Sequence, residues 1–301
     1  MSLACRSPER IQSVVIARKR LNWTNTIVIG VVHVLAILAV VYLAAVQTSP
    51  WTLGLGALWA LLCGLSITGG YHRLFSHAAY EASVPVRLLY LLFGAAAVQN
   101  SALKWAGDHR VHHARVDLEE DPYNITRGFW WAHIGWVLCK GDRVDSKITN
   151  DLSQDPLVRW QDRYYVLIAV MMGVVVPAAL GSIWGDPVGA VLVAGFLRLA
   201  LQWHGAFAVN SVAHTLGRRP YDRNSSARDS IVTALITLGE GYHNFHHRFK
   251  ADYRNGVRWY HFDPTKWFVW SLSKVGLTRN LRRVTREVID RARREAVATS
   301  S

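Results

Sequence analysis

The sequence predicts an all-α membrane protein with four transmembrane helices in two hairpins and a helical cap that carries a histidine-ligated di-metal site. Three observations support this fold class. The 301-residue chain is 51 % hydrophobic and contains 13 Trp, which is rich for a soluble protein of this size. Its longest apolar runs occur in adjacent pairs, and nine of its 13 His fall into four tight groups. The basic residues are concentrated outside the apolar runs.

The four spans are predicted from two pairs of apolar runs. Residues 26–47 and 51–68 form the first pair, and residues 164–184 and 187–209 form the second. Each run is close to the roughly 20 residues that a helix needs to cross the hydrocarbon core of a bilayer. Only two or three residues connect the runs of a pair. Each pair is therefore expected to form a transmembrane hairpin.

Charge sets the predicted orientation. The two hairpin tips, residues 47–50 and 185–186, contain no Lys or Arg, whereas residues 104–163 and both ends of the chain hold most of the basic residues. Because positive charge is retained on the cytoplasmic side, we expect a multi-pass integral membrane protein whose termini and active site are cytoplasmic. The shorter apolar stretch Leu88–Val98 is then a buried or interfacial helix, since a crossing would separate the first two histidine groups.

We expect one domain, residues 23–275, between a basic cytosolic amino-terminal segment, residues 1–22, and a basic amphipathic tail, residues 276–301. The amino terminus lacks the features of a secretory signal peptide. In the tail, residues 281–292 place apolar side chains on one helical face and Arg elsewhere, which is typical of a helix on a membrane surface. The net charge of +13 is interpreted as a sign of topology and of contact with the lipid bilayer. No nucleic-acid partner is expected.

Cysteine and glycine patterns argue against two other kinds of cofactor site. Cys5, Cys63 and Cys139 are scattered and odd in number, so neither a disulfide framework nor a cysteine-ligated cluster is expected. The pair of glycines in residues 54–56 lies inside a predicted span and not between a strand and a helix, so it does not indicate a dinucleotide site. The chain is therefore expected to carry no electron source of its own.

Two histidine groups have the spacing of metal ligands on a helix. Residues 109–113 read HRVHH and residues 243–247 read HNFHH. Positions three and four apart share a helical face, so the three His of each group can converge. His72 and His77 are five apart, about 140° around an ideal helix. They are expected to straddle the site from a helix end or a bend, for which Gly69-Gly70 provides a cause.

The fourth group predicts that the last span continues beyond the bilayer. An i, i+4 row runs along it through Arg198, Gln202, Ala206, Asn210 and His214. The helix would deliver His214 to the metal site, with Asn210 one turn below. Arg198 lies near mid-span, where a charge costs about 2.5 to 3.5 kcal/mol on insertion scales, so we expect it to face the bundle and to have a polar partner. Packing or a single hydrogen bond is expected for the four remaining histidines, His33, His133, His204 and His261.

Imidazole binds first-row transition metals, and too many imidazoles are present for one tetrahedral zinc. The residues alone therefore predict a multinuclear, all-nitrogen site, which suits oxygen chemistry. Metal-bound imidazoles usually donate their second nitrogen to a carboxylate or a carbonyl. Asp108 and Glu240 are close enough in sequence to act in this way; helix capping or a surface ion pair is the alternative for each.

The order of the groups, HRLFSH, HRVHH, NSVAH and HNFHH, resembles the integral-membrane acyl-CoA desaturases of the stearoyl-CoA Δ9 type. The resemblance runs from about residue 22 to about residue 267 and includes WAGDHRVHH, RGFWWAHIGW, RRPYDRN and GEGYHNFHH. It implies a non-haem centre of two iron ions, Fe²⁺. One iron would take His72, His77, His109, His113 and His247. The other would take His112, His214, His243 and His246, with Asn210 reaching it through a water.

The implied reaction is the introduction of a cis double bond, at Δ9, into a saturated fatty acyl-CoA, with O₂ as co-substrate. Removal of hydrogen from an unactivated methylene requires a stronger oxidant than any acid or base side chain, and a protein obtains one by reducing O₂ at iron. Two electrons must come from a separate donor, a ferredoxin, a cytochrome or a flavin-linked reductase. The resemblance also implies a kinked apolar tunnel beneath the metals that fixes which carbons react.

Two alternatives remain open. The same scaffold would serve a fatty acyl hydroxylase or acetylenase, because these reactions differ from desaturation by small changes in geometry. A histidine-rich metal transporter or metal-binding membrane protein is the alternative from another class. The histidine groups lie at span ends and in loops on one side, without a ladder of ligands across the bilayer, which argues against transport.

The resemblance implies four contacts with the CoA head group, at Asn25, Asn100, Asp108 and Lys140. The chain departs from the family pattern at Gly107, where related sequences commonly carry an Arg that helps to hold the charged head. A well-formed charge-assisted contact is worth about 1.5 to 3 kcal/mol. We therefore expect acyl-CoA to be held more weakly, or Lys140 and neighbouring basic residues to compensate.

Overall fold

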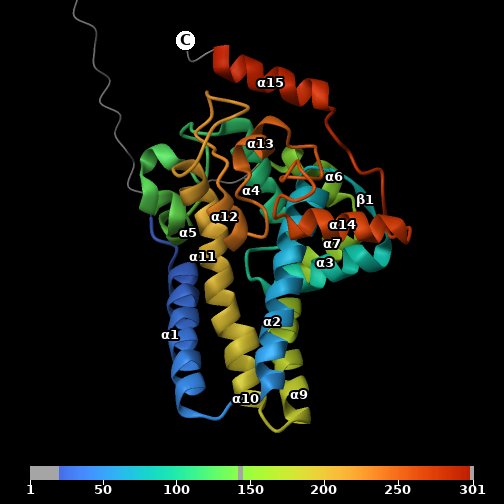
Figure 1. Ribbon diagram of the computed structural model, residues 1–301. Helices are drawn as coiled ribbons and strands as arrows, with labels where there is room; N and C mark the ends of the chain where they lie inside the picture. The colour runs from blue at the N-terminus through green and yellow to red at the C-terminus, as the bar shows by residue number, and fades with distance from the viewer. Residues whose placement is uncertain (1–19, 142–144, 299–301) are drawn as a thin grey trace, which may run out of the picture.

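The computed structural model describes residues 20–141 and 145–298. Four of the described helices are long and apolar enough to cross a membrane, namely Trp23–Ala45, Pro50–Ser76, Tyr165–Ile183 and Pro187–His214. They form one bundle, and both short connections, residues 46–49 and 184–186, lie at the same end of it (Figure 1). The cap, which we define as residues 77–141, 145–163 and 215–298, lies at the other end. The predicted basic segment, residues 1–22, falls almost wholly outside the described residues.

Two of the four helices extend beyond the apolar runs that predicted them. The second continues from residue 68 to Ser76, and the fourth continues from residue 209 to His214. Both extensions are polar turns that follow the apolar part without a break, so hydropathy alone underestimates them. The predicted extension of the last helix to His214 is confirmed.

Stretches of π-helix and 3₁₀-helix divide three of the long helices into consecutive segments. The first hairpin consists of α1 (Trp23–Ala45), α2 (Pro50–Leu65) and the π-helix η1 (Ser66–Ser76). The third long helix consists of α8 (Tyr165–Val170), η5 (Met171–Val175) and α9 (Val176–Ile183). The fourth consists of α10 (Pro187–Ala190), η6 (Val191–Leu197), α11 (Arg198–Ser211) and η7 (Val212–His214). Side-chain caps start the first and the fourth long helices, with Asn22 at α1 and Asp186 at α10.

The cap is built of short helices and one small sheet. Its first part contains α3 (Val84–Ala96), α4 (Ala102–Arg115), η2 (Ile125–Arg127), η3 (Trp131–Gly135), α5 (Trp136–Leu138), η4 (Ser146–Thr149), α6 (Asn150–Ser153) and α7 (Pro156–Arg163). Its second part contains α12 (Ile231–Ile236), α13 (His243–Arg248), α14 (Pro264–Lys274) and α15 (Arg286–Ala298). Strands β1 (Glu81–Ala82) and β2 (Thr278–Arg279) pair antiparallel and join the two parts, with Glu81 opposite Arg279.

The apolar stretch at residues 88–98 forms most of α3, which has 13 residues and is too short to span a bilayer. It packs against η1, where the two backbones approach closely. A Cβ atom added at Gly70 would lie 2.6 Å from Cβ of Tyr90, which is fully buried. Gly70 therefore allows the helix that carries His72 to rest directly on α3.

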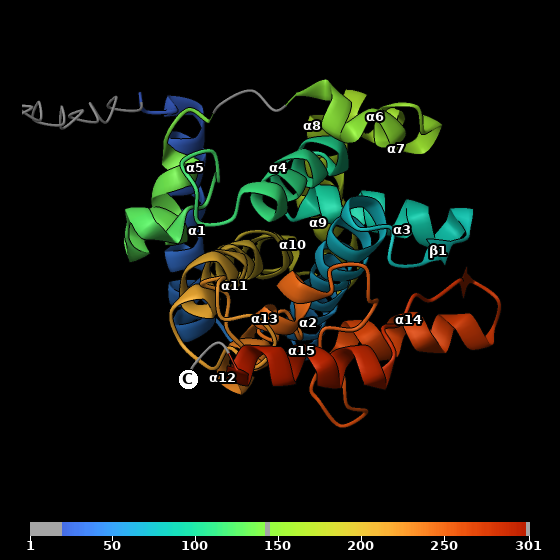
Figure 2. The same ribbon diagram turned by 90° about the horizontal axis from the view of Figure 1, so that it is seen from above.

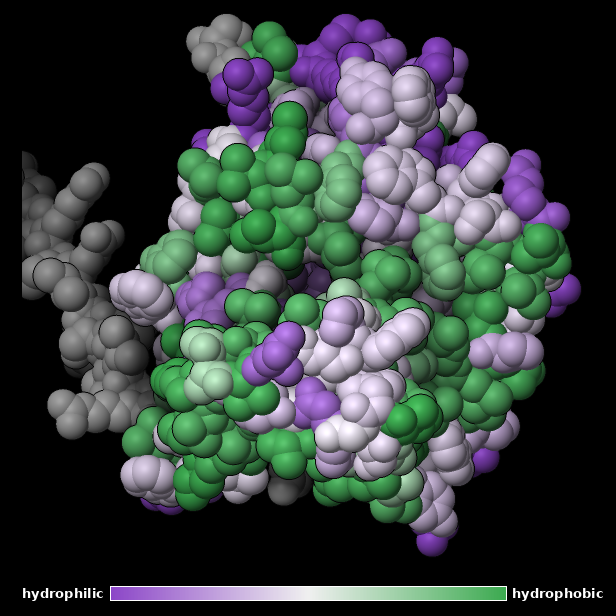
Figure 3. Space-filling view, turned by 60° about the horizontal axis from the view of Figure 1, so that its bottom comes forward, coloured by the Kyte–Doolittle hydropathy of each residue, from purple (hydrophilic) through white to green (hydrophobic). Residues whose placement is uncertain are grey.

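The outer faces of the spans remain apolar. On α1, Val31, Val34, Ile37 and Val41 are each at least half exposed. Figure 3, which brings the span end of the molecule forward, shows hydrophobic side chains over much of this surface. Exposed apolar area of this extent requires a nonpolar environment. The structure therefore supports an integral membrane protein.

The tail differs from its prediction. Its helix, α15, begins at Arg286 and not at residue 281, and it lies on the cap at the end away from the spans (Figure 1). Ile289 packs against Tyr221 and Phe245 in a small hydrophobic cluster. The apolar face of the helix is therefore covered by the cap, and the predicted contact of this face with a membrane surface is wrong.

Candidate metal centre

The four histidine groups converge where the long helices meet the cap. They come from η1 and the residue after it, from α4, from η7 and from α13. Within each of two sets, one ligand atom of every residue lies within 4.8 Å of the others. The first set contains His72, His77, His109, His113 and His246, and the second contains His112, His214, His243 and His247. All nine predicted histidines are therefore brought together.

A π-helix positions the first pair. In η1 the backbone bonds connect residues five apart, and the N–H of His77 donates to the carbonyl of His72 over 3.3 Å. Residues five apart are thus stacked one turn above another, and the two rings lie 5.0 Å apart. The separation of about 140° in an α-helix does not apply. The bend predicted near Gly69-Gly70 is this π-helix.

The imidazoles face one another through their Nε2 atoms. In the first set, Nε2 of His246 lies 2.9 Å from Nε2 of both His72 and His113. In the second set, Nε2 of His243 lies 3.1 Å from that of His214 and 3.0 Å from that of His247. A single ring proton cannot bridge two neighbours at once. The crowded nitrogens of each set therefore leave lone pairs that face one another.

The opposite ring nitrogens are held by the protein. Nδ1 of His72 lies 2.7 Å from Oε2 of Glu240, and Nδ1 of His112 lies 2.8 Å from Oδ1 of Asp121. A carboxylate accepts, so in both rings Nδ1 carries the proton and Nε2 offers its lone pair inward. This arrangement fits a cation within each set, and all-imidazole donors suit first-row transition metals.

Six ligand histidines of the cap are neutral. Burial first, and neighbouring imidazoles second, hold their pKa values well below the usual range; this applies to His77, His109, His113, His243, His246 and His247. Only the neutral ring has a lone pair for a metal. These six rings are therefore in the form that can bind a metal.

A buried ion network supports the carboxylate that orients His72. Arg73 is 1 % exposed, and its Nη2 donates to Oε1 of Glu240 over 2.9 Å while its Nη1 lies 3.0 Å from Oδ1 of Asp263. Burial raises the pKa of Glu240, but His72 and Arg73 outweigh burial and lower it to about 2. The carboxylate stays ionised and available to His72.

The two carboxylates predicted to orient ligands have different surroundings. Glu240 contacts His72 as described. Asp108 accepts no hydrogen bond from a histidine among the described residues; it lines the cavity below, where burial raises its pKa to about 6 against the opposing effect of Lys104. Asp121 is the carboxylate that contacts His112. It follows that histidine by nine residues, a separation with no local pattern, so sequence reasoning missed it.

A hydroxyl holds the last ligand. Nδ1 of His214 lies 2.6 Å from Oγ of Ser226, which in turn donates to Oδ1 of Asp117 over 2.5 Å. Neither Ser226 nor Asp117 carried a signal in the sequence, since they are separated from His214 and from each other by loops.

The division of ligands between the two sets differs from the one that the family resemblance implied. His246 belongs with His72, and His247 belongs with His112 and His214. The expected division is therefore wrong at these two positions. Adjacent residues on a helix point about 100° apart. The rotation of α13 against α4 and η1 decides which of the two reaches which set.

A cavity of about 1720 Å³ extends from the histidines into the span bundle. Its walls include four ligands, His72, His109, His112 and His243, together with Asn210. The four expected head-group residues, Asn25, Asn100, Asp108 and Lys140, also line it. Its apolar part is lined by Ile29, Val32, Leu199, Trp203 and Phe207, among others. The cavity thus connects polar residues, the histidine sets and an apolar region between the spans. Gly107 is buried within α4.

The partners of Arg198 are now defined. Its Nη1 donates to the carbonyl of Ala96 over 3.1 Å and to Oε1 of Gln202 over 3.0 Å, and the residue is 4 % exposed. The Nε2 of Gln202 donates to the carbonyl of Ala60 over 2.9 Å. The expectation of a buried arginine with a polar partner is confirmed, and the partners tie α11 to α3 and α2.

Three of the histidines outside the metal sets form a chain. Nε2 of His33 lies 3.0 Å from Nε2 of His204, whose Nδ1 lies 3.1 Å from Nε2 of His133. His133 also contacts Ser211 over 2.9 Å. Each ring therefore has more than the single hydrogen bond that was expected. His261 stacks on Tyr242 with ring centroids 4.8 Å apart.

Comparison with known proteins agrees with this geometry. Residues 48–280 match the family model described as fatty acid desaturase. The probable acyl-CoA desaturase of Schizosaccharomyces pombe is 43 % identical over 266 residues, which cover 87 % of this chain and 55 % of that protein. Acyl-CoA desaturase 1 of Saccharomyces cerevisiae is 42 % identical over 233 residues, which cover 76 % of this chain and 46 % of that protein. The chain thus spans about half the length of these two relatives.

A mammalian relative is covered more fully. Stearoyl-CoA desaturase 5 of Homo sapiens is 36 % identical over 298 residues, which cover 94 % of this chain and 87 % of that protein. The aligned part of the chain therefore includes both hairpins and most of the cap. On the strength of the family match and of these relatives, the chain belongs to the fatty acid desaturases, a family of oxidoreductase enzymes.

Proposed function

We propose that this protein is an O₂-dependent acyl-CoA desaturase that introduces a cis double bond at Δ9 of a saturated fatty acyl chain. One observation carries the proposal: a single cavity joins the polar residues Asn25 and Lys140, four ligand histidines and an apolar region between the spans. A thioester of a long fatty acid has this same order of a charged head and an apolar chain. The relatives named acyl-CoA and stearoyl-CoA desaturases support the same substrate class.

Two iron ions are the proposed metals. The His246 set and the His247 set would each hold one, with Asn210 contributing to the second through a water. Support for Asn210 comes from its place on the cavity wall, one helical turn before His214. Iron bound there supplies the oxidant, through the reduction of O₂, that removes hydrogen from two adjacent methylenes.

The reaction balances with an external electron source. Two hydrogen atoms leave the acyl chain, two electrons arrive from a donor and two protons from solvent, and O₂ becomes two waters. A separate ferredoxin, cytochrome or flavin-linked reductase is the proposed donor. The basic residues of the cap favour a cytoplasmic position for the active site and both termini.

The residues of the chain position the substrate. Asn25 donates through Nδ2 to the carbonyl of Val137 over 2.9 Å, which leaves its side-chain oxygen to accept from the head group. Lys140 is exposed at the polar part of the cavity and suits a phosphate. Trp203 and Phe207 line the apolar part and exclude water from the acyl chain. Binding in one fixed pose would then determine which carbons lie beside the metals.

The decisive experiment is expression of the full chain in a host that lacks unsaturated fatty acids, with product structure determined by mass spectrometry. Restored growth with a cis double bond at Δ9 supports the proposal. A hydroxylated or triple-bonded product would identify the alternative chemistry on this scaffold. Purified enzyme should then be assayed on stearoyl-CoA, on an acyl carrier protein thioester and on phospholipid. Turnover on phospholipid alone would exclude acyl-CoA as the substrate.

A further inference from the structure

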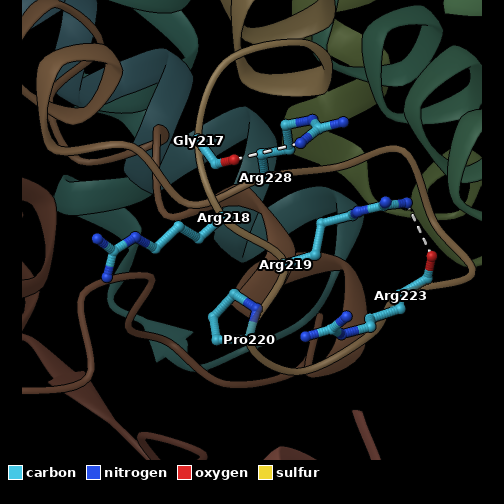
Figure 4. A pocket seen from close by; sticks show the side chains of 6 residues that line it. All are labelled: Gly217, Arg218, Arg219, Pro220, Arg223 and Arg228. Atoms are coloured by element: carbon cyan, nitrogen blue, oxygen red, sulfur yellow. Dashed lines mark hydrogen bonds between the residues drawn. The ribbon is translucent and has the colours of Figure 1, made fainter. Parts of the chain in front are cut away.

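A strongly basic loop lies directly over the second histidine set. Residues 217–228, which we call the arginine loop, connect η7 to the segment before α12. The loop borders a hollow of about 370 Å³ lined by Gly217, Arg218, Arg219, Pro220, Arg223 and Arg228 (Figure 4). Four of these six lining residues are arginines. The loop therefore concentrates positive charge at one place on the cap.

These four arginines have no carboxylate partner within residues 20–141 and 145–298. The side chains of Arg219 and Arg228 donate only to backbone carbonyls. Arg219 donates to Arg223 over 2.8 Å and to Ser225 over 3.5 Å. Arg228 donates to Gly217 over 3.2 Å. The side chains of Arg218 and Arg223 are exposed, and the dashed bond drawn to Arg223 in Figure 4 ends at its backbone carbonyl. The buried Nε of Arg228 also lacks a partner.

Several other arginines of the cap are neutralised. Ion pairs with carboxylates are formed by Arg110, Arg127, Arg248 and Arg254. Within the arginine loop, Asp222 accepts from the backbone N–H of Asn224 instead. The buried Asp229, which follows the loop, accepts from the N–H groups of Asn244 and Phe245. The positive field of the loop is therefore directed outward.

The loop is bonded to two ligands of the second histidine set. Ser226, a loop residue, contacts Nδ1 of His214. The carbonyl of Arg228 accepts from the N–H of His243 over 3.3 Å, and the N–H of Arg228 donates to the carbonyl of Ala213 over 2.7 Å. Only the loop residues bonded to these ligands would thus separate an electron carrier bound to this loop from the metal.

We propose that the arginine loop is the docking surface for an acidic, one-electron carrier protein that reduces the metal of the second histidine set. This inference rests on the proposed desaturase function, which requires two electrons from outside in each turnover. Complementary charge raises the rate of encounter by a factor of about 10 to 1,000 and makes it sensitive to salt. Two successive carriers, each losing one electron and leaving oxidised, would complete one reaction.

The test compares two reductants on the full chain in lipid nanodiscs loaded with iron. The protein reductants are a plant-type ferredoxin and the soluble haem domain of a cytochrome b5, both acidic. The small reductant is dithionite-reduced methyl viologen, a cation that gains nothing from arginines. The variant is Arg218→Glu with Arg223→Glu, because neither side chain makes a hydrogen bond to another residue of the described part of the chain. The matched control is Arg159→Glu, an exposed arginine of α7, which lies on the side of the cap opposite α12 (Figure 2).

The double variant should raise the carrier concentration for half-maximal rate by about tenfold or more and reduce its dependence on salt. Its viologen-driven rate should equal that of the wild type, and Arg159→Glu should change neither. An unchanged carrier dependence in the double variant would overturn the proposal. A raised KM for acyl-CoA in the viologen assay, with carrier dependence unchanged, would also overturn it and assign the loop to the acyl carrier.

Failure of the desaturase function is distinguishable from failure of docking. Oxidation of the carrier is followed by its own absorbance, and the double bond is followed by mass spectrometry. Loop-dependent carrier oxidation without a double bond would retain the docking surface and reject the desaturase function. If neither carrier reduces the wild-type protein but viologen does, an acidic protein donor at this loop is excluded.

Discussion

His72 and Arg73 are neighbours in the chain, and both contact the same carboxylate, Glu240, one through each oxygen. The π-helical turn of η1 makes this possible, because it directs the two side chains toward the same buried acid. Glu240 thereby orients a ligand of the first histidine set, and Arg73 keeps the acid ionised. The structural support of the metal site is thus part of the same segment that supplies the ligand.

Replacement of Glu240 by Gln should weaken this support. The amide keeps its shape but is a poorer acceptor for the Nδ1 proton of His72. Loss of such a partner typically costs 10- to 100-fold in metal affinity or activity. Iron content after dialysis and turnover of the loaded enzyme both report the effect. Asp108→Asn, which alters a carboxylate without a histidine contact, should retain iron like the wild type; equal iron loss in both variants would argue against a special role for Glu240.

Replacement of any one of the nine set histidines by Ala should abolish desaturation while the protein still inserts into membranes, because the spans supply insertion. His246→Ala and His247→Ala test the revised division directly. Each should lose one iron, and Mössbauer spectra should show that different irons remain. His261→Ala is the control, since that ring stacks on Tyr242 outside both sets. Identical spectra from the two variants would contradict the assignment of these residues to separate metals.

Asn210→Ala should reduce activity and perturb one iron without loss of both, because its proposed contact passes through a water. The measurement is iron stoichiometry together with the spectrum of each iron. Asn210→Asp, which keeps an oxygen acceptor, should recover part of the activity. Equal loss of both irons in Asn210→Ala would instead indicate a structural role.

Arg198→Met should destabilise the bundle. The variant leaves the carbonyl of Ala96 and the side chain of Gln202 without their donor, and an unsatisfied buried polar group costs about 1 to 3 kcal/mol. Thermal unfolding in detergent should show a clear decrease in Tm. Arg279→Ala removes only the exposed pair with Glu81, which solvent screens, and should change Tm little. A larger decrease in Tm for Arg279→Ala than for Arg198→Met would refute the importance of the buried contacts.

Removal of metal should lower thermal stability. The inward lone pairs of each histidine set repel one another without a cation, and a ligand bound only by the folded state stabilises that state. Chelation followed by calorimetry should show a lower Tm, which Fe²⁺ restores. If chelation removes the iron but leaves Tm unchanged, the metal does not stabilise the fold, and packing of the cap alone holds the histidines together.

The sequence by itself determined the features that depend on local periodicity. Apolar runs predicted the four long helices, spacings of three and four predicted that each HxxHH lies on one helical face, and the row through Asn210 predicted the extension to His214. Each of these follows from the repeat of one helix and needs no knowledge of its neighbours.

Only the tertiary structure decided how these elements face one another. Whether His246 or His247 joins the first set depends on the rotation of α13, and the partners Asp121 and Ser226 come from loops with no periodic signal. The apolar face of α15 packs against Tyr221 and Phe245 and not against lipid. Local sequence sets which side of a helix is apolar or carries ligands, but long-range packing selects what covers that side, because many partners satisfy the same local pattern.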